Sequence, residues 1–128
     1  MEKRELDNIP MLALAYIGDA VYELRVRELL VAKGVTKVGE LHAKSVDFVS
    51  AAAQSVLLHE IEDILTEEEK QIFRRGRNAK SGHQPPNTTV GAYRRATGLE
   101  ALIGYLYLAQ KVDRLEIIFE RLFAQHII

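Results

Sequence analysis

The sequence contains no cysteine, only three prolines and no long apolar run. The absence of cysteine excludes disulfide bonds and thiolate metal sites, and it suits a reducing compartment such as the cytosol. No apolar run approaches the roughly 18 residues that a membrane-spanning helix needs. The N-terminal segment, residues 1–5, is too acidic and too polar for a signal peptide. We therefore expect a cytoplasmic protein that does not associate with membranes.

The chain also lacks an excess of charge of either sign, because 17 Lys/Arg stand against 18 Asp/Glu. A net charge of −1 gives no general attraction to nucleic acid. The distribution is uneven, however. Residues 70–95 contain seven Lys/Arg and no Asp/Glu, whereas the rest of the chain has ten Lys/Arg and eighteen Asp/Glu. A local field of this kind can hold a polyanion even when the total charge is near zero.

The length of 128 residues fits a single domain, residues 1–128, with a substantial core. Helical periodicity dominates, and no segment alternates with the period of two expected for a strand. We therefore predict an all-α fold. A first long helix begins near Pro10 and ends near Gly34. The next helix begins at Thr36 or Lys37 and breaks near Ser45.

The apolar, alanine-rich residues 46–58 predict a central core helix. Thr66, followed three residues later by Glu69, forms a capping-box pattern that begins a further helix. That helix runs into the basic segment. The remaining predicted elements are a loop at residues 81–87, a helix from Val90, a second apolar helix at residues 99–109, and a last helix opened by a capping box of Asp113 and Glu116.

Asp19 lies in the middle of an apolar helical stretch, between the small residues Gly18 and Ala20. A carboxylate buried without a partner is costly, and small neighbours let a metal or another backbone come close. A structural role, as a helix cap or an arginine partner, explains the pattern equally well. Glu23 lies one turn further along on roughly the same face, where it either contacts a metal through water or pairs with Arg27.

Glu100 heads an otherwise apolar helical stretch that again contains small residues. An acid near a helix N-terminus is also favoured by the helix dipole, and this structural interpretation is stronger here than for Asp19. Two inward-facing acids on two helices, beside a cationic segment, make a hard-oxygen site for Mg²⁺ and a clamp for phosphate. Asp19 and Glu100 are therefore the candidate catalytic and metal-binding residues.

The acid-free segment supplies the candidate phosphate-contacting residues. A basic helix end is often only a solvated surface that suits the helix dipole. Here the excess of positive charge continues through a loop into the next helix, so we predict a surface that contacts phosphates. Its residues are Arg74, Arg75, Arg77, Asn78, Lys80, Arg94 and Arg95.

Three ordered motifs resemble the catalytic domain of the ribonuclease III family in its Mini-III form. They are residues 13–23 (ALAYIGDAVYE), 73–80 (FRRGRNAK) and 93–108 (YRRATGLEALIGYLYL), and the resemblance spans about residues 7–125. It implies a helical bundle like that of the ribonuclease III catalytic domain, which forms a homodimer and hydrolyses double-stranded RNA with Mg²⁺. It places Asp19 on the family's signature aspartate and Glu100 on its metal-binding glutamate.

The sequence also departs from the larger relatives at two acidic positions. Ala15 stands four residues before the signature aspartate, and Thr97 stands three residues before the late glutamate. The Mini-III branch tends to share this reduction. Two alternatives are compatible with the missing acids: a non-catalytic module that binds double-stranded RNA or the ribosome on a degenerate nuclease fold, and a helical protein-interaction module.

The resemblance further implies the substrate and the partners. The substrate of the Mini-III branch is precursor 23S ribosomal RNA in bacteria, and a large-subunit ribosomal protein is a further partner that the resemblance allows. A two-fold dimer would place one site on each strand of a duplex. We expect its surface around Gly18 and Ala20 or at residues 102–106, where the helices are apolar and rich in small residues.

Overall fold

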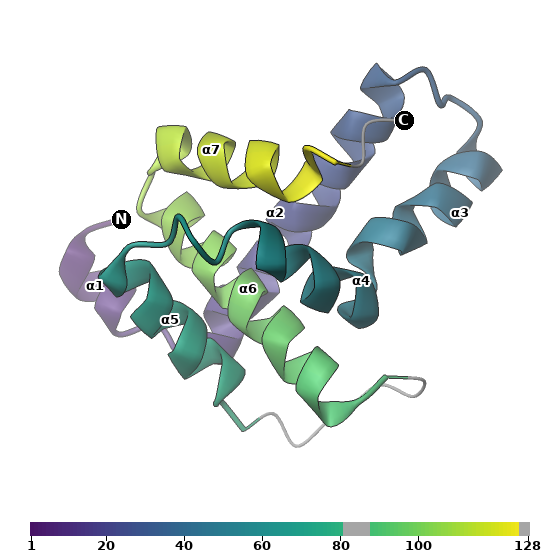
Figure 1. The fold of residues 1–128 in the computed structure, drawn as a ribbon. Helices are drawn as coiled ribbons and strands as arrows, with labels where there is room; N and C mark the ends of the chain where they lie inside the picture. The colour runs from purple at the N-terminus through teal and green to yellow at the C-terminus, as the bar shows by residue number, and fades with distance from the viewer. Residues whose placement is uncertain (81–87, 126–128) are drawn as a thin grey trace.

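The structure is a computed structural model that describes residues 1–80 and 88–125, so the predicted loop at residues 81–87 lies outside the described residues. The described residues form helices and contain no strand, which confirms the all-α prediction. No helix within these two ranges is both long enough and apolar enough to cross a membrane. The elements in chain order are α1 (Lys3–Asp7), α2 (Met11–Ala32), α3 (Val38–Val49), α4 (Ala51–Leu57), the 3₁₀ turn η1 (Leu58–Glu60), α5 (Glu67–Arg77), α6 (Val90–Leu108) and α7 (Val112–Phe123) (Figure 1).

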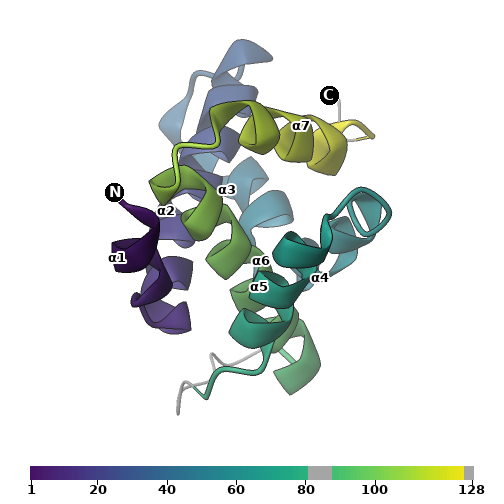
Figure 2. The ribbon, with the colours of Figure 1, turned by 90° about the vertical axis from the view of Figure 1, so that its left-hand side faces the viewer.

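Helix α6 lies in the middle of the molecule and contacts α2, α4, α5 and α7 (Figure 1). Figure 2 shows α1 and α2 on one side of α6, and α4 and α5 on the other. Every residue of α6 from Ala96 to Leu106 is buried, except Glu100, which is half-buried. Glu100 is thus the one charged residue in the buried stretch of α6, and its carboxyl group is largely shielded from water.

The prediction that residues 46–58 form the central core helix is wrong, because the chain changes direction at Ser50. Helix α3 continues through Ser45 to Val49, and α4 then begins at Ala51. Ser50 has an extended backbone, and its hydroxyl accepts a hydrogen bond from the Ala53 amide at 3.1 Å. This N-cap satisfies an amide that would otherwise lack a partner, so it favours a new helix start over a continuous helix.

One of the two predicted capping boxes is confirmed. Thr66 Oγ1 accepts from the Glu69 amide at 3.1 Å, and Glu69 Oε1 accepts from the Thr66 amide at 2.9 Å. The second box is wrong, because α7 begins without a side-chain cap. Glu116 instead pairs with Arg25 of α2, whose Nη2 donates to Glu116 Oε2 at 2.7 Å. Glu116 therefore accepts from a distant guanidinium and does not cap the backbone at the start of its own helix.

The ends of α2 agree with the sequence, whereas the division of α6 does not. Pro10 directly precedes α2, and α2 ends at Ala32, shortly before Gly34 turns the chain with φ +93°. The predicted second apolar helix at residues 99–109 is the continuation of α6, which runs unbroken from Val90 to Leu108. The glycine at position 98 does not end the helix, because the Phe73 ring and backbone pack directly on it.

An aromatic cluster joins α2, α3 and α7 on the far side of the core from α5. Tyr22 is fully buried, and its hydroxyl donates to the Phe48 carbonyl oxygen at 2.6 Å. Its ring packs edge-on against Phe123 at 5.7 Å between centroids and lies 6.2 Å from Phe119. Buried aromatic pairs of this kind add to the stabilisation from burial alone. The cluster fixes α2, and α2 carries Asp19.

Candidate active site

Asp19 and Glu100 meet because α2 and α6 cross at two glycines. A Cβ at Gly18 would lie 1.7 Å from the Glu100 carbonyl oxygen, and one at Gly104 would lie 1.9 Å from the Leu14 carbonyl oxygen. Glycine is therefore required at both positions for the backbones to approach this closely. Asp19 follows Gly18 directly, and its carboxyl group comes within hydrogen-bonding reach of the Glu100 carboxyl group.

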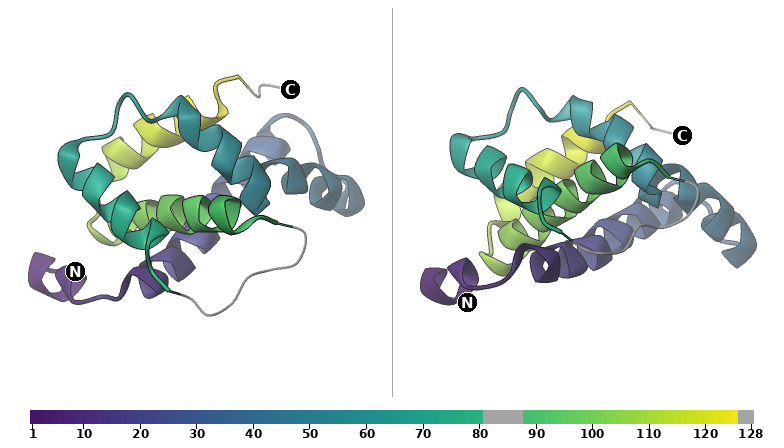
Figure 3. Two further views of the ribbon diagram at one scale, coloured as in Figure 1. Left: turned by 60° about the horizontal axis from the view of Figure 1, so that its bottom comes forward. Right: turned by 90° about the horizontal axis from the view of Figure 1, so that it is seen from below.

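The two acids share a cavity of about 430 Å³ between α2, the junction of α3 and α4, and α6. Asp19 is exposed and Glu100 is half-buried, so the cavity connects the acids with solvent. Figure 3 shows α2 and α6 from below, where they pass each other. The cavity is lined by Leu12, Ala15, Tyr16, Asp19, Val49, Ala51, Gln54, Tyr93, Ala96, Thr97 and Glu100.

The electrostatics of this pair suit a cation. Burial, and then the charge of the neighbouring Asp19, raise the pKa of Glu100 to about 8, although a hydrogen bond from Gln54 partly opposes the shift. Among the described residues, no Lys or Arg lies within ion-pairing distance of either carboxyl group. A divalent ion between the two groups would remove their repulsion and favour the ionised form of both.

Gln54 is a site residue that the sequence motifs do not reveal. It lies on α4 with 1% of its surface exposed, and its Nε2 donates to Glu100 Oε2 at 3.2 Å and to the Val49 carbonyl oxygen at 3.1 Å. Its Oε1 is buried without a hydrogen-bond partner. The one signal in the sequence is a lone amide in the apolar, alanine-rich residues 46–58, because a buried amide needs polar partners.

The donor set fits Mg²⁺, which prefers oxygen ligands and keeps several of its waters. The carboxyl groups of Asp19 and Glu100 line the cavity together with Gln54, whose amide oxygen is buried without a hydrogen-bond partner. In the part of the chain that the structure describes, no group of three or more His, Cys, Asp and Glu side chains could hold a metal. The protein would therefore supply few charged ligands, and water and phosphate oxygens would complete the shell. Glu23 does not line the cavity and pairs with Arg27 at 3.3 Å, as the second of its two interpretations predicted.

The two positions that lack the acids of the larger relatives both line the cavity. Ala15 and Thr97 are each 7% exposed. The Thr97 hydroxyl donates to the Tyr93 carbonyl oxygen at 3.0 Å, so it is turned back onto its own helix. The site is thus reduced in charge at the positions that would have added ligands.

The predicted RNA-binding residues lie on α5, directly after its end and on α6, but they do not all lie on one surface. Arg75 lines a separate cavity of about 270 Å³ near α1, together with Asp7 and Glu68. Arg95 reaches α4, where its Nε donates to Ser55 Oγ at 2.6 Å. Arg94 is exposed one turn before Gly98 of the same helix.

Close packing of α5 on α6 brings the remaining basic residues, at the end of α5, near the middle of α6. A Cβ at Gly76 would lie 2.7 Å from Ala101 Cβ, so the last turn of α5 lies against the middle of α6. Arg77 lies over the Phe73 ring at 5.9 Å, and its Nε donates to the Asn78 side chain at 3.2 Å. Arg74 and Lys80 are exposed. None of the seven predicted residues takes part in an ion pair with another described residue.

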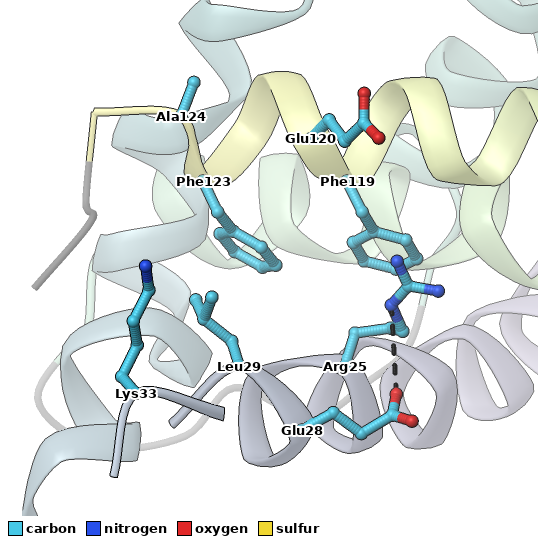
Figure 4. Close-up of a pocket in the computed structure, with 8 residues that line it drawn as sticks. All are labelled: Arg25, Glu28, Leu29, Lys33, Phe119, Glu120, Phe123 and Ala124. Carbon is cyan, nitrogen blue, oxygen red and sulfur yellow. Dashed lines mark ion pairs between the residues drawn. The ribbon is translucent and has the colours of Figure 1, made fainter. Parts of the chain in front are cut away.

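A cavity of about 680 Å³, larger than that of the two acids, lies elsewhere, between the second half of α2 and α7 (Figure 4). It shares no lining residue with the cavity of the two acids. Arg25, one of the two basic residues that line it, is paired with Glu28 at 3.9 Å and with Glu116, and it lies over the Phe119 ring at 4.9 Å. A guanidinium occupied in this way holds α7 on α2 and is not available to a phosphate.

Comparison with known proteins gives concordant results. Residues 12–111 match the family described as the ribonuclease III domain. A protein from Clostridium tetani called Mini-ribonuclease 3 is 48% identical over 89% of this chain and 76% of its own. A protein of the same name from Brevibacillus brevis is 45% identical over 97% and 96% of the two chains. A crystal structure of a Fusobacterium nucleatum protein is 33% identical, with a TM-score of 0.82 over 93% of this chain and 95% of that one.

Proposed function

Because the chain belongs to the Mini-ribonuclease 3 branch of the ribonuclease III family, we propose that it cuts double-stranded RNA at the cavity between Asp19 and Glu100. By homology it is an endoribonuclease of the ribonuclease III type. This assignment is preferred over the two non-catalytic alternatives, an RNA- or ribosome-binding module and a protein-interaction module. The observation that carries the proposal is the meeting of these two acids at the α2–α6 crossing, with no cationic side chain among the described residues to neutralise them.

We propose that Asp19 and Glu100 hold Mg²⁺, directly or through water. When bound, such an ion supplies an activated water and stabilises the charge that develops on the phosphate during hydrolysis. Glu100 gives up its proton when the site is loaded, because its raised pKa reflects burial and the charge of Asp19. Ala15 and Thr97 leave room beside the acids for phosphate oxygens.

The RNA backbone would be held by Arg74, Arg77, Asn78, Lys80, Arg94 and Arg95, and by Arg75 beside the cavity near α1. Two observations support this set: all but the half-buried Arg77 are exposed, and none has an acidic ion-pair partner among the described residues. Since A-form RNA is read mainly by shape and by 2′-hydroxyl contacts, we expect little base specificity from them. Precursor 23S ribosomal RNA in the bacterial cytoplasm is the proposed substrate, and a large-subunit ribosomal protein would supply specificity that this domain lacks.

We also propose that the protein acts as a homodimer, through the face of α2 that contains Ala20, which is part of one of the two surfaces expected from the sequence. Gly18 is buried against α6, and residues 102–106 are buried in the core. The exposed apolar face of α2 is the better surface. It is a stripe of residues four apart in sequence, and Tyr16 and Leu24 in it are 80% and 58% exposed. The dimer stripe consists of Leu12, Tyr16, Ala20 and Leu24.

Cleavage of an unmodified RNA duplex, with Mg²⁺ and with EDTA, tests the function. Cleavage should require the metal, and Asp19→Asn should abolish most of it while keeping the fold, because the amide is nearly isosteric and Asp19 is exposed. Asp47→Asn, an exposed aspartate on α3 outside the cavity, is the matched control and should cut normally. Near-normal turnover by folded Asp19→Asn would place the catalytic metal elsewhere.

A further inference from the structure

Gln54 is the one residue of the acid cavity that combines nearly complete burial with an unsatisfied polar atom among the described residues. Its Nε2 has two acceptors, Glu100 Oε2 at 3.2 Å and the Val49 carbonyl oxygen at 3.1 Å. A backbone carbonyl only accepts, so the NH₂ group must be the end that faces Val49. The orientation of the amide is thereby fixed, and its carbonyl oxygen remains buried without a donor.

A buried carbonyl oxygen without a donor is unfavourable, and native proteins keep such groups only rarely. A hydrophobic residue at this position would avoid the penalty, and the neighbours of Gln54 on α4 are mostly apolar. The amide is also placed against Glu100, on the wall of the same cavity that Asp19 lines. The position therefore retains a polar group whose second end is available to accept from a water or to contact an ion.

We propose that Gln54 is a positioning residue of the metal site, which holds Glu100 through its NH₂ group and offers its carbonyl oxygen to the divalent ion, directly or through water. This inference rests on the proposed metal-dependent function. It supplies an oxygen from a third helix, α4, to a site whose other two donors come from α2 and α6. The neutral oxygen would thus replace one of the metal ligands that acidic side chains at positions 15 and 97 would have supplied, where this chain has Ala15 and Thr97.

The choice of an amide over a carboxylate has a physical reason. A third carboxylate within hydrogen-bonding distance of Glu100 would add repulsion to a pair that already repels. A glutamine provides an oxygen of the kind that Mg²⁺ accepts, and it donates to Glu100 without adding charge. The metal-free protein is therefore less destabilised than one with three carboxylates would be, and the site binds its ion more weakly than a three-carboxylate site would.

Binding of Mn²⁺ to the full-length protein in the absence of RNA, followed by electron paramagnetic resonance, tests this role without reference to activity. Mn²⁺ is a suitable probe because it shares the oxygen preference of Mg²⁺. Gln54→Leu should weaken Mn²⁺ binding about tenfold, the lower end of the range for residues that support metal ligands. Gln54→Glu should bind Mn²⁺ more tightly than the wild type, because it places a carboxylate at a position from which we expect the side chain to reach the ion.

Ser55→Ala is the matched control, because Ser55 is the next residue of α4 and is also buried, but it contacts Arg95 and not the acids. It should bind Mn²⁺ like the wild type. Equal Mn²⁺ affinity of wild type and folded Gln54→Leu would overturn the inference, as would weaker binding by Gln54→Glu if Gln54→Leu fails to fold. A wild type that binds no Mn²⁺ would overturn the metal-dependent function as well, so the two failures are distinct.

Discussion

At the scale of single residues, the environment of Glu100 differs most from that of an ordinary surface acid. It is the half-buried member of an otherwise buried stretch of α6, with Asp19 on one side and Gln54 on the other. Its raised pKa means that the folded, metal-free protein binds a proton at this group more tightly than the unfolded chain does. The metal-free site therefore costs stability wherever Glu100 is ionised.

The sign of this cost gives a prediction. The unfolded chain loses the Glu100 proton near pH 4.5 and the folded protein near pH 8, so the folded state becomes less stable as pH rises between these values. Glu100→Gln should remove that loss. In EDTA, urea unfolding should show the variant to be more stable than wild type by on the order of 2 kcal/mol at pH 8.5, and by little at pH 4.5. A difference that is the same at both pH values would contradict the raised pKa.

At the scale of the elements, the site depends on how closely α2 and α5 approach α6. Gly18 and Gly104 allow α2 to touch α6, whereas Gly76 and Gly98 allow α5 to do so. The acid pair thus depends on the α2–α6 contact, and the position of the basic residues at the end of α5 depends on the α5–α6 contact. The end of α5 opposite the basic residues is held by Glu69, which accepts from Arg114 of α7 at 2.7 Å.

Adding one methyl group at the α2–α6 crossing tests this account. Gly104→Ala should lower the unfolding free energy by at least about 3 kcal/mol, because the new Cβ meets a backbone oxygen and not a movable side chain. It should also weaken Mn²⁺ binding by separating the two acids. Gly39→Ala on α3 is the control, since nothing lies within 4 Å of its Cβ, and it should stabilise by about 0.5–1 kcal/mol. A wild-type melting temperature for Gly104→Ala would disprove the close crossing.

At the scale of the whole molecule, charge and apolar surface are separated. The body of the protein is acidic, and residues 70–95 carry the unbalanced positive charge. The exposed apolar groups gather along α2 and continue past its middle to Tyr107 and Val112, which line one groove of about 440 Å³ with Leu24. One region is thus suited to a polyanion and another to a protein surface.

The basic region should determine how RNA binding depends on salt. Arg77→Gln with Lys80→Gln should weaken binding of an RNA duplex and make the plot of log affinity against log salt less steep, by up to about 0.7–0.9 for each phosphate that the variant no longer neutralises. Binding is measured in Ca²⁺ or without metal, so that the duplex stays intact. Lys37→Gln with Lys44→Gln removes the same charge from the region of α3 and should leave the slope unchanged. The RNA lies elsewhere if the first pair of changes has no effect on the slope.

The dimer stripe should determine the oligomeric state. Leu24→Glu places a charge in the apolar face and should convert a dimer into a folded monomer in sedimentation equilibrium. Val38→Glu is a matched control, because Val38 is 67% exposed but lies on α3, outside the stripe. The variant should remain dimeric. A wild type that is monomeric at concentrations where it cuts both strands would rule out the proposed arrangement.

The sequence by itself determined the all-α class, the ends of α2 and the Thr66 capping box, and it singled out Asp19 and Glu100 as the two candidate acids. These features depend on neighbours within about one helical turn, or on motifs that are contiguous in the chain. Only the tertiary structure decided that α6 and not residues 46–58 is central, that Glu116 pairs with Arg25, and that Gln54 touches Glu100. Each of these is a contact between residues 46 or more positions apart, or follows from the packing of several helices on one. Local periodicity gives the face that a residue occupies on its helix, but it carries no information on which other helix covers that face.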